Sequence, residues 1–360
     1  MSFSRNPWYY NFAVKLFIFI AVVTVLIAGS AIFIPLMIAI FFTFLLLPVS
    51  RALERKKIPR FIAILISIFI ALFLFSGVIY FFINQLNSFR DDLPEIQNQL
   101  LAKGGQILIW TEEITDISPD RQIDWLRNKA TEFAKDGPTV IMGIFSTTGN
   151  FLALFALIPF YIFFLTYFRE KYRRFIILVD KHNHRRTLDI IKKISFVSRN
   201  YLKGVFLDVL ILSILGSVGY LLLGIKHAIL FGVMAAILNI IPYIGVLIGS
   251  LLPILMALIT KDEIGYAVGA AGVAIAVQFI DNNFISPYVV GSSVSINPLT
   301  AIIVLLAGGL LWGVAGMILS IPLAGMMKVA FDNIETLKPY GYLIGEEVNF
   351  KGKGFFNSKV

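Results

Sequence analysis

A polar helix face occurs in the stretch 278–291, "QFIDNNFISPYVVG", directly after a long apolar run. Gln278, Asp281 and Asn282 are separated by three and four residues, so they share one face of a helix, whereas Asn283 points elsewhere. An acid within a membrane span is costly and marks a substrate, ion or proton pathway by default. The spacing therefore predicts a polar binding face. The competing interpretation is the plain end of a membrane helix that meets water.

A second acid, Asp208, lies just inside another apolar run, in "YLKGVFLDVLILSILG". Burial disfavours the charged form of a carboxyl group. Asp208 and Asp281 are therefore candidates for carrying a proton or for binding a cation. The alternative for Asp208 is an interfacial acid that pairs with Lys203 or Arg199.

The residue types that catalysis would require are scarce. The sequence has no cysteine and no H-E-x-x-H motif, which excludes thiolate sites and that class of zinc hydrolase. His182 and His184 lie among arginines, which indicates a solvated surface, a metal-ligand pair being the alternative. We therefore predict that the protein is not an enzyme and that it uses no metal and no cofactor.

The elements that carry these residues are membrane helices. Of the 360 residues, 58% are hydrophobic and 15% are charged, and the mean hydropathy is +0.83. A soluble domain could not bury so much apolar surface, and several apolar runs exceed the roughly 18 residues of a transmembrane candidate. We predict an all-α polytopic membrane protein with about eight apolar spans. They lie near 12–34, 35–48, 61–83, 141–168, 205–223, 228–259, 264–284 and 299–327. Pro35 and Pro48 bracket the short second span, so 12–48 is expected to form a tight helical hairpin.

Charge in the connecting segments predicts the orientation. The net charge is +4 in 51–60 and +8 in 169–203, whereas it is −4 in 84–136. The positive-inside rule places the first two segments in the cytoplasm and the third outside. Both termini are then predicted to be cytoplasmic. The overall charge of +9 reflects this topology, so we predict no nucleic-acid partner.

The same pattern divides the chain into six segments. They are the N-terminal spans 1–83, an external segment 84–138, a span 139–168, a basic cytoplasmic linker 169–203, a C-terminal core 204–327 and a cytoplasmic tail 328–360. The external segment contains an amphipathic helix that opens at Ser118 and Pro119 and lies either on the bilayer or on the protein's own membrane domain. The basic linker is predicted to lie against anionic lipid headgroups.

The span 228–259 is too long for one straight crossing. It would measure about 48 Å as a single helix, against a hydrocarbon core of about 30 Å. Asn239 and Pro242 lie near its middle, and Gly245 and Gly249 weaken the helix further. Discontinuous helices of this kind carry midplane substrate sites in transporters. The alternative is a proline kink in which Gly245 and Gly249 form a helix-packing face.

The last span, 299–327, is also overlong and contains Gly308, Gly309, Gly313, Gly316 and Pro322. Two overlong, interrupted spans form the pattern associated with transporter sites. Whether each one crosses, kinks or folds back is left open. Asp281 lies seventeen residues beyond Ile264, about 26 Å along the span 264–284, which predicts a position near the outer interface.

Five blocks, taken in order, carry a family resemblance. They are "YLKG" (201–204), "LLLGI…LNIIPYIG" (221–245), "QFIDNNFISPYVVG" (278–291), "INPL" (296–299) and "AGGLLWGVAGMILSIP" (307–322). Together they resemble the autoinducer-2 exporter family, also called PerM-type permeases, over essentially the whole chain. The chain departs from the family pattern at Val205, Val246 and Asn297, where glutamine, proline and histidine are usual, so the resemblance does not fix the substrate.

The resemblance implies a transporter in the inner membrane of a bacterial cell that exports a small polar molecule, an autoinducer-2-like signal or another metabolite. Alternating access at the broken helices is the expected mechanism. A sodium (lithium)/proton antiporter is the alternative, and a structural or regulatory membrane protein is the third hypothesis. Expected partners are anionic lipid headgroups, a small polar substrate, and H⁺ or Na⁺, with homo-oligomerisation left open.

The site residues follow from the polar faces, the helix breaks and the resemblance together. Substrate or ion binding is assigned to Asn239, Pro242, Gly245, Gln278, Asp281, Asn282 and Asn297, and coupling to Asp208 and Asp281. Structural or hinge roles are assigned to Tyr201, Gly204, Gly249, Pro287, Gly291, Pro298, Gly309 and Gly313.

Overall fold

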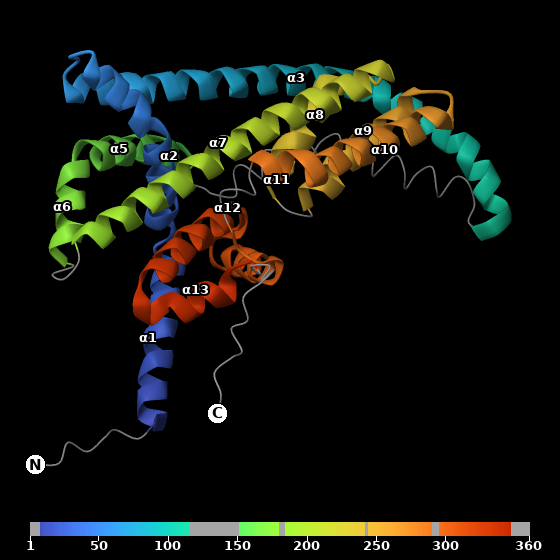
Figure 1. Ribbon diagram of the computed structural model, residues 1–360. Coiled ribbons are helices and arrows are strands. Elements are labelled where there is room, and N and C mark those ends of the chain that lie inside the picture. Colours follow the sequence, from blue (N-terminus) through green and yellow to red (C-terminus); the bar gives the residue numbers. More distant parts are fainter. Residues whose placement is uncertain (1–7, 116–150, 180–183, 242–243, 290–294, 347–360) are drawn as a thin grey trace, which may run out of the picture. The chain divides into compact units, whose positions relative to one another are not determined.

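The protein is helical throughout the residues that the computed structural model describes, namely 8–115, 151–179, 184–241, 244–289 and 295–346 (Figure 1). The elements are α1 (Trp8–Ala28), α2 (Ser30–Arg55), α3 (Arg60–Thr115), α5 (Phe151–Tyr167), α6 (Arg169–Val179), α7 (His184–Leu222), α8 (Ala228–Leu238), α9 (Ile244–Thr260), α10 (Ile264–Ile280), the π-helix η1 (Asp281–Ile285), α11 (Ser286–Val289), α12 (Pro298–Asn333), the 3₁₀-helix η3 (Glu335–Leu337) and α13 (Lys338–Ile344). Within these ranges six helices are long and apolar enough to span a membrane, and three shorter apolar helices accompany them. The predicted all-α polytopic class is confirmed.

Some sequence predictions fall outside the described residues. They concern the external amphipathic helix after Ser118, the start of the span 141–168, His182, Pro242 and Gly291. The six-segment division of the chain also stays a prediction.

The chain forms two compact units. The core unit comprises Leu46–Phe163 and Lys203–Val289, and the tail unit comprises Met1–Leu45, Phe164–Leu202 and Val290–Val360. The polar face around Asp281 belongs to the core unit, whereas Asn297 belongs to the tail unit. Each unit is described below by itself.

The first two helices meet at Gly29 rather than at Pro35. Both Pro35 and Pro48 lie inside α2. The backbone hydrogen bonds continue past the junction, since Gly29 donates to Val25 and Phe33 donates to Gly29. Lipid offers a helix no other hydrogen-bond partners, so a proline that removes one bond does not end the helix there.

The overlong span 228–259 folds back on itself. α8 ends at Leu238 and α9 begins at Ile244, and the two helices lie beside each other (Figure 1). Gly249 of α9 packs so closely on Ala235 of α8 that an added Cβ would lie 2.7 Å from the Ala235 Cα. α8 measures about 17 Å, roughly half of the hydrocarbon core. The pair is therefore a re-entrant hairpin, called the α8–α9 hairpin below.

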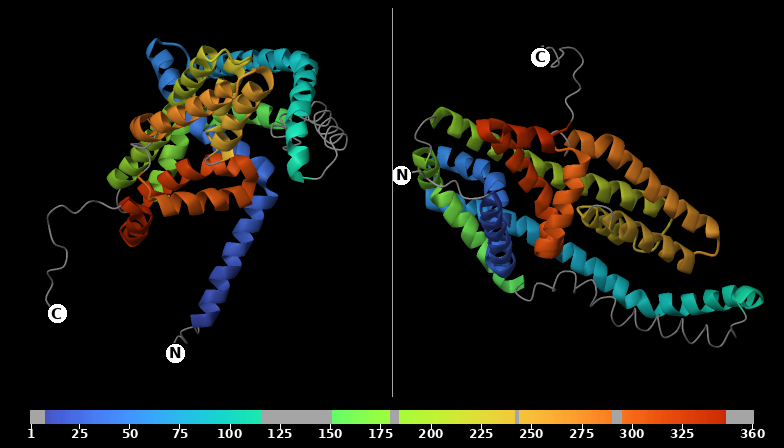
Figure 2. Two further views of the ribbon diagram at one scale, coloured as in Figure 1. Left: turned by 90° about the vertical axis from the view of Figure 1, so that its right-hand side faces the viewer. Right: turned by 90° about the horizontal axis from the view of Figure 1, so that it is seen from below.

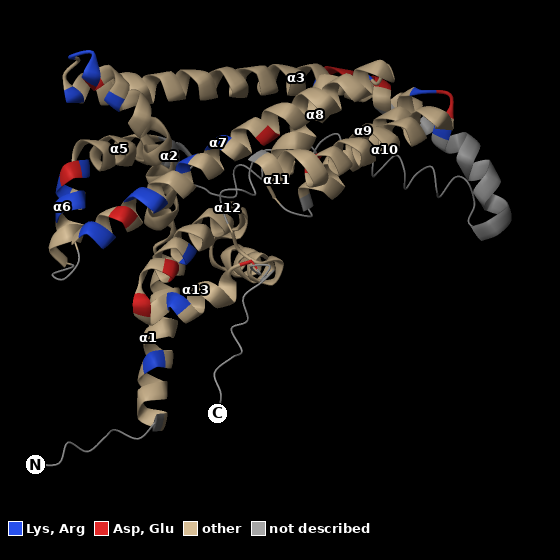
Figure 3. Ribbon diagram, in the orientation of Figure 1, with Lys and Arg blue, Asp and Glu red and all other residues tan. Residues whose placement is uncertain are grey.

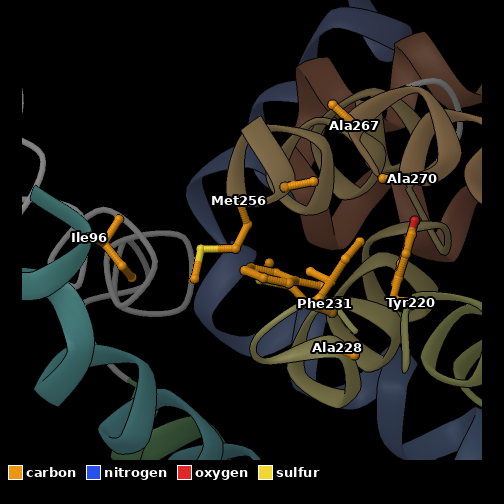
Figure 4. Packing of buried hydrophobic residues seen from close by; sticks show 10 residues of the cluster. Ile96, Tyr220, Ala228, Phe231, Met256, Ala267 and Ala270 are labelled. Atoms are coloured by element: carbon orange, nitrogen blue, oxygen red, sulfur yellow. The ribbon is translucent and has the colours of Figure 1, made fainter. Parts of the chain in front are cut away.

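The base of this hairpin packs on α3 through apolar side chains. Figure 4 shows the buried cluster, to which α3 contributes Ile96, the hairpin contributes Phe231 and Met256, and α7 contributes Tyr220. The other members are Ile225, Ala228, Met234, Ala257, Ala267 and Ala270. The small alanines of α9 and α10 allow the helices to approach closely.

Charged side chains reinforce the same base. Lys226 Nζ lies 3.1 Å from Asp92 Oδ2 and 3.2 Å from Glu95 Oε2, so the turn before α8 is tied to α3. Farther along α3, Lys103 donates to the carbonyl of Lys261, at the end of α9. Both open ends of the hairpin are thus held against the same helix.

The last overlong span, in the tail unit, also folds back. Trp312 (φ −138°, ψ 21°) and Gly313 (φ 60°, ψ −139°) interrupt α12 and divide it into limbs 298–311 and 314–333, which run in different directions (Figure 2). The positive φ of Gly313 is a conformation that a residue with a Cβ rarely adopts. A Cβ on Gly308 would collide with Ser320 Oγ, twelve residues later, so the limbs are in close contact.

Candidate functional site

Asp281 is the centre of a polar cluster in the core unit. It lies at the junction of α10 and η1, and only 3% of its surface is exposed. Its Oδ2 accepts hydrogen bonds from Asn239 Nδ2 at 3.0 Å and from Gln278 Nε2 at 3.4 Å. Its Oδ1 accepts one from Ser286 Oγ at 2.8 Å. We call these four residues together with Asp208 the Asp281 cluster.

A π-helical turn brings Ser286 to Asp281. In η1 the backbone N–H of Ser286 donates to the carbonyl of Asp281, five residues earlier. The wider turn places side chains i and i+5 together, and such turns occur frequently at functional sites. Ser286 was missed from the sequence because helical spacing was counted with the α-helical period, and its position before Pro287 gave no other signal.

Asp208 reaches the cluster from α7. Its carboxyl group lies within hydrogen-bonding range of the carboxyl group of Asp281. Two carboxyl groups can share a hydrogen bond only when one of them carries a proton. Asp208 Oδ1 is buried and has no hydrogen-bond partner among the described residues, which leaves one acceptor in the cluster unused. Pairing with Lys203 or Arg199, the alternative considered for Asp208, is not the contact that the structure gives.

The tip of the α8–α9 hairpin supplies Asn239. Asn239 directly follows Leu238, the last residue of α8, and its N–H still donates to Ala235, so the backbone is helical up to this position. Gly245 begins the return limb, and a Cβ there would collide with the backbone carbonyl of Leu238. The absence of that Cβ lets the hairpin close tightly enough to point Asn239 at Asp281. Gly245 and Gly249 thus form a helix-packing face at the break itself.

Apolar side chains enclose the cluster. Leu212, Ala236 and Ile285 are buried together, and partly buried Val209 and Ile280 pack against them. Hydrogen bonds and charges interact more strongly in such a low-dielectric environment than in water. Figure 3 shows that charged residues elsewhere gather mainly at helix ends and connecting turns. An acid held inside a membrane helix bundle is therefore unusual for this chain and expensive without a function.

The remaining residues of the polar stretch lie at its edge. Asn282 is exposed and accepts a hydrogen bond from Gln278 at 3.0 Å. Asn283 donates back to the carbonyl of Phe279 in its own helix and does not join the cluster, as the helical spacing predicted. Pro287 lies in α11 and is exposed.

The fold-back of the hairpin changes the direction of α10. Because α9 ends beside α3 near the turn that precedes α8, α10 starts at the end of the unit where α7 stops. It then runs back along α7 until Asp281 meets Asp208. The position of Asp281 near the outer interface was predicted from the rise along its own span alone, and it stays a prediction.

Asn297 lies in the tail unit, where its contacts are structural. Its Oδ1 caps α12 by accepting from the N–H of Thr300 at 2.8 Å, directly before Pro298. Its Nδ2 donates to the carbonyl of Leu343 at 2.8 Å and so holds α13. Substrate binding by Asn297 remains a prediction, but these bonds account for the residue without a ligand.

The other predicted hinge residues are placed as follows. Tyr201 packs against a small cluster of the tail unit formed by Ile296 and Ala324. Gly204 is buried within α7. Gly309 faces the flexible side chain of Met317 across the two limbs of α12. Their roles as hinges stay predictions.

Comparison with known proteins agrees with this architecture. The family model described as "AI-2E family transporter" matches residues 16–336. The chain is 30% identical over 312 residues to the Bacillus subtilis (strain 168) protein named "Putative transport protein YrrI", which covers 83% of this chain and 86% of that protein. It is 28% identical over 328 residues to YueF of the same organism, with 86% and 85% covered.

A third relative, a transport protein by name from Haemophilus influenzae, is 26% identical over 352 residues, covering 92% of this chain and 96% of its own length. The family match spans both units, the α8–α9 hairpin and the Asp281 cluster. The chain therefore belongs to the AI-2E transporter family and is a multi-span membrane transport protein.

Proposed function

We propose that the Asp281 cluster is the site at which this transporter binds a small polar molecule and exports it by alternating access. The observation that carries the proposal is the hydrogen bond between Asn239, at the tip of a re-entrant hairpin, and the buried carboxylate of Asp281. Discontinuous helices place substrate sites near the midplane in other transporters. A hairpin that leaves and rejoins the cluster would open the site and then close it.

The donors of the cluster suit a substrate rich in oxygen. Asn239, Gln278 and Ser286 offer amide and hydroxyl groups, and Asp281 offers acceptors. A hydroxylated or carbonyl-containing molecule could replace the hydrogen bonds among these side chains as they separate. An autoinducer-2-like signal fits this chemistry, and so do other small polar metabolites.

Charge and topology suggest the side to which each hairpin opens. The base of the α8–α9 hairpin is tied to the part of α3 that begins the acidic segment 84–136, which the positive-inside rule places outside. In the tail unit, the end of α12 is bound by Arg186 and Lys193 of the basic linker, which the same rule places in the cytoplasm. We propose an inner-membrane protein with cytoplasmic termini on this basis.

A sodium (lithium)/proton antiporter is the second candidate. The carboxyl groups of Asp208 and Asp281 lie close together, so a proton held between them would relieve their repulsion, and Asp208 Oδ1 has no hydrogen-bond partner among the described residues. A monovalent cation could displace the proton and use that oxygen. If the protein is an exporter, the same proton would couple to substrate movement. Both functions therefore place the proton on the Asp208–Asp281 pair.

Purified protein in liposomes distinguishes the two functions. With a pH-sensitive dye inside, added Na⁺ or Li⁺ moves protons if the protein is an antiporter. Uptake of a labelled polar metabolite without a cation response supports export. Asp208→Asn and Asp281→Asn should each abolish the productive response, while Asn283→Ala is the matched control because its side chain bonds only its own helix. Full activity in both aspartate variants would remove the cluster from the mechanism.

A further inference from the structure

The short helix α6 has an apolar face that no other part of the described structure buries. Tyr172, Phe175, Ile176 and Val179 follow the i, i+3, i+4, i+7 spacing of one helix face. Their exposed fractions are 43%, 64%, 42% and 67%. None of the residues of α6 is buried. An exposed apolar face of this kind marks a surface that contacts a membrane or a partner.

The rest of α6 is basic. Arg169, Lys171, Arg173 and Arg174 accompany one acid, Glu170. Glu170 lies 3.9 Å from Arg169 and 3.7 Å from Arg173. Within the part of the chain that the structure describes, Lys171 and Arg174 form no ion pair, so α6 carries an excess of positive charge beside its apolar face. A surface with both properties matches a layer of anionic phosphate groups over acyl chains.

The position of α6 along the chain keeps it at a membrane surface. α5 is apolar up to Tyr167, and α6 begins at Arg169, so only Phe168 separates them. Phe164, Tyr167 and Phe168 form an aromatic group at this junction, with ring centroids 5.9 Å apart for Phe164–Phe168 and 5.1 Å for Tyr167–Phe168. Tyrosine concentrates where membrane helices meet the headgroups, and Tyr167 lies at this boundary. Figure 1 shows the chain turning at this point into α6.

We propose that α6 lies in the cytoplasmic headgroup layer, with Tyr172, Phe175, Ile176 and Val179 against the acyl chains and its basic side chains on anionic phospholipid headgroups. The lipid bilayer is favoured over a protein partner because α6 follows the apolar helix α5 directly and combines an apolar face with basic residues. Anchored in this way, α6 fixes the start of the linker that leads to α7. The proposal does not depend on the transported substrate.

The absence of cysteine from the sequence makes a direct test available. Spin labels would be attached to the full-length protein at Phe175→Cys, on the apolar face, and at Glu170→Cys, on the opposite face, which keeps all four basic residues. The protein would be placed in vesicles of phosphatidylcholine with phosphatidylglycerol. The label at 175 should be reached by dissolved oxygen, and the label at 170 by a water-soluble nickel chelate. Equal access of the chelate to both labels would overturn the proposal.

A second arm tests the role of the headgroup charge. In vesicles of phosphatidylcholine alone, or with the variant Arg173→Gln/Arg174→Gln, the label at 175 should shift toward chelate access. Each neutralised arginine should change the ratio of immersed to displaced label by about fivefold, which corresponds to ~1 kcal/mol. Immersion that is insensitive to both changes would contradict recognition of anionic lipid.

Two further outcomes identify a different occupant. If excess inorganic phosphate displaces the label as effectively as removal of phosphatidylglycerol, the basic residues bind a soluble anion instead. If labels at 175 broaden each other's spectra in the same vesicles, the apolar face contacts a second copy of the chain. Either result would overturn the proposal that α6 binds the lipid surface.

Discussion

Ser286 donates a hydrogen bond of 2.8 Å to Asp281 Oδ1 across a single π-helical turn, while Asn239 donates to the opposite oxygen from the tip of a separate hairpin. The buried carboxylate of Asp281 therefore accepts one hydrogen bond from Ser286, close by in the same helical segment, and another from Asn239, in the re-entrant α8–α9 hairpin. Ser286 orients the carboxylate, whereas the hydrogen bond from Asn239 forms only when the hairpin is closed. This division of roles underlies the predictions below.

Removal of the Ser286 hydroxyl group should impair transport without unfolding the protein. Ser286→Ala leaves Asp281 Oδ1 without its donor, and a hydrogen bond to a charged group contributes about 1.5–3 kcal/mol. We expect the initial transport rate to fall by roughly tenfold or more. Ser286→Thr, which keeps the hydroxyl group, should retain most of the rate. Equal rates for Ser286→Ala and the wild type would show that Ser286 does not position Asp281.

Closure of the α8–α9 hairpin should depend on the missing side chain at 245. Gly245→Ala places a Cβ against the carbonyl of Leu238, and overpacking of this kind costs about 1–3 kcal/mol. We expect a lower unfolding temperature in detergent and a weaker transport response. The control is Gly272→Ala on α10, where an added Cβ meets no atom within 4 Å of the described structure. A loss of stability in the control as large as that in Gly245→Ala would contradict the steric explanation.

The tip of the α12 hairpin should reject every residue with a Cβ. Gly313 combines φ 60° with ψ −139°, outside the left-handed helical region that asparagine tolerates. We expect Gly313→Ala and Gly313→Asn to destabilise the protein to a similar extent, by about 1–3 kcal/mol. Thermal unfolding measures the effect, with Gly265→Ala as a control at an open position. Rescue by asparagine would indicate a different backbone at the tip.

The base of the α8–α9 hairpin should loosen in acid. Burial is the largest effect on His227 and lowers its pKa below 6.5; nearby Asp92 opposes this and Lys226 adds to it. The unfolded chain then binds the proton first as the pH falls below about 6.5, so stability decreases with decreasing pH in that range and is fully present above it. Hydrogen exchange of the α8 amides on either side of that pH measures the change. His227→Gln should flatten this pH dependence, and an unchanged slope in that variant would assign it to another group.

Much of this architecture was predictable from residue patterns. The apolar runs located the helices, and Asn239, Gly245 and Gly249 marked the break in the span 228–259. The spacing of Gln278 and Asp281 gave their shared face, and Asn283 was correctly set aside. These features are local, because helix period and backbone propensity act over a few residues.

The remaining features depend on tertiary contacts or on small backbone energies. An overlong span with a break permits a kink or a hairpin, and only the packing of Gly249 on Ala235 decides between them. That choice reverses α10 and thereby brings Asp281 to Asp208, which no spacing could predict. The π-turn that recruits Ser286 differs from an α-turn by one residue, and the hydrogen bond from Asn297 Nδ2 to Leu343 depends on a distant helix, α13.

A covalent cross-link between the α8–α9 hairpin and η1 tests most directly whether the hairpin must move. Ala236 of α8 and Ile285 of η1 are buried in one apolar group beside Asp281. Because the chain has no cysteine, Ala236→Cys/Ile285→Cys allows a single, short thiol cross-link between them, and each single variant is a control. The account predicts that cross-linking stops transport in liposomes and that a cleavable linker restores it on reduction. Transport that continues at an unchanged rate with the hairpin cross-linked would contradict the central claim that the hairpin must leave Asp281.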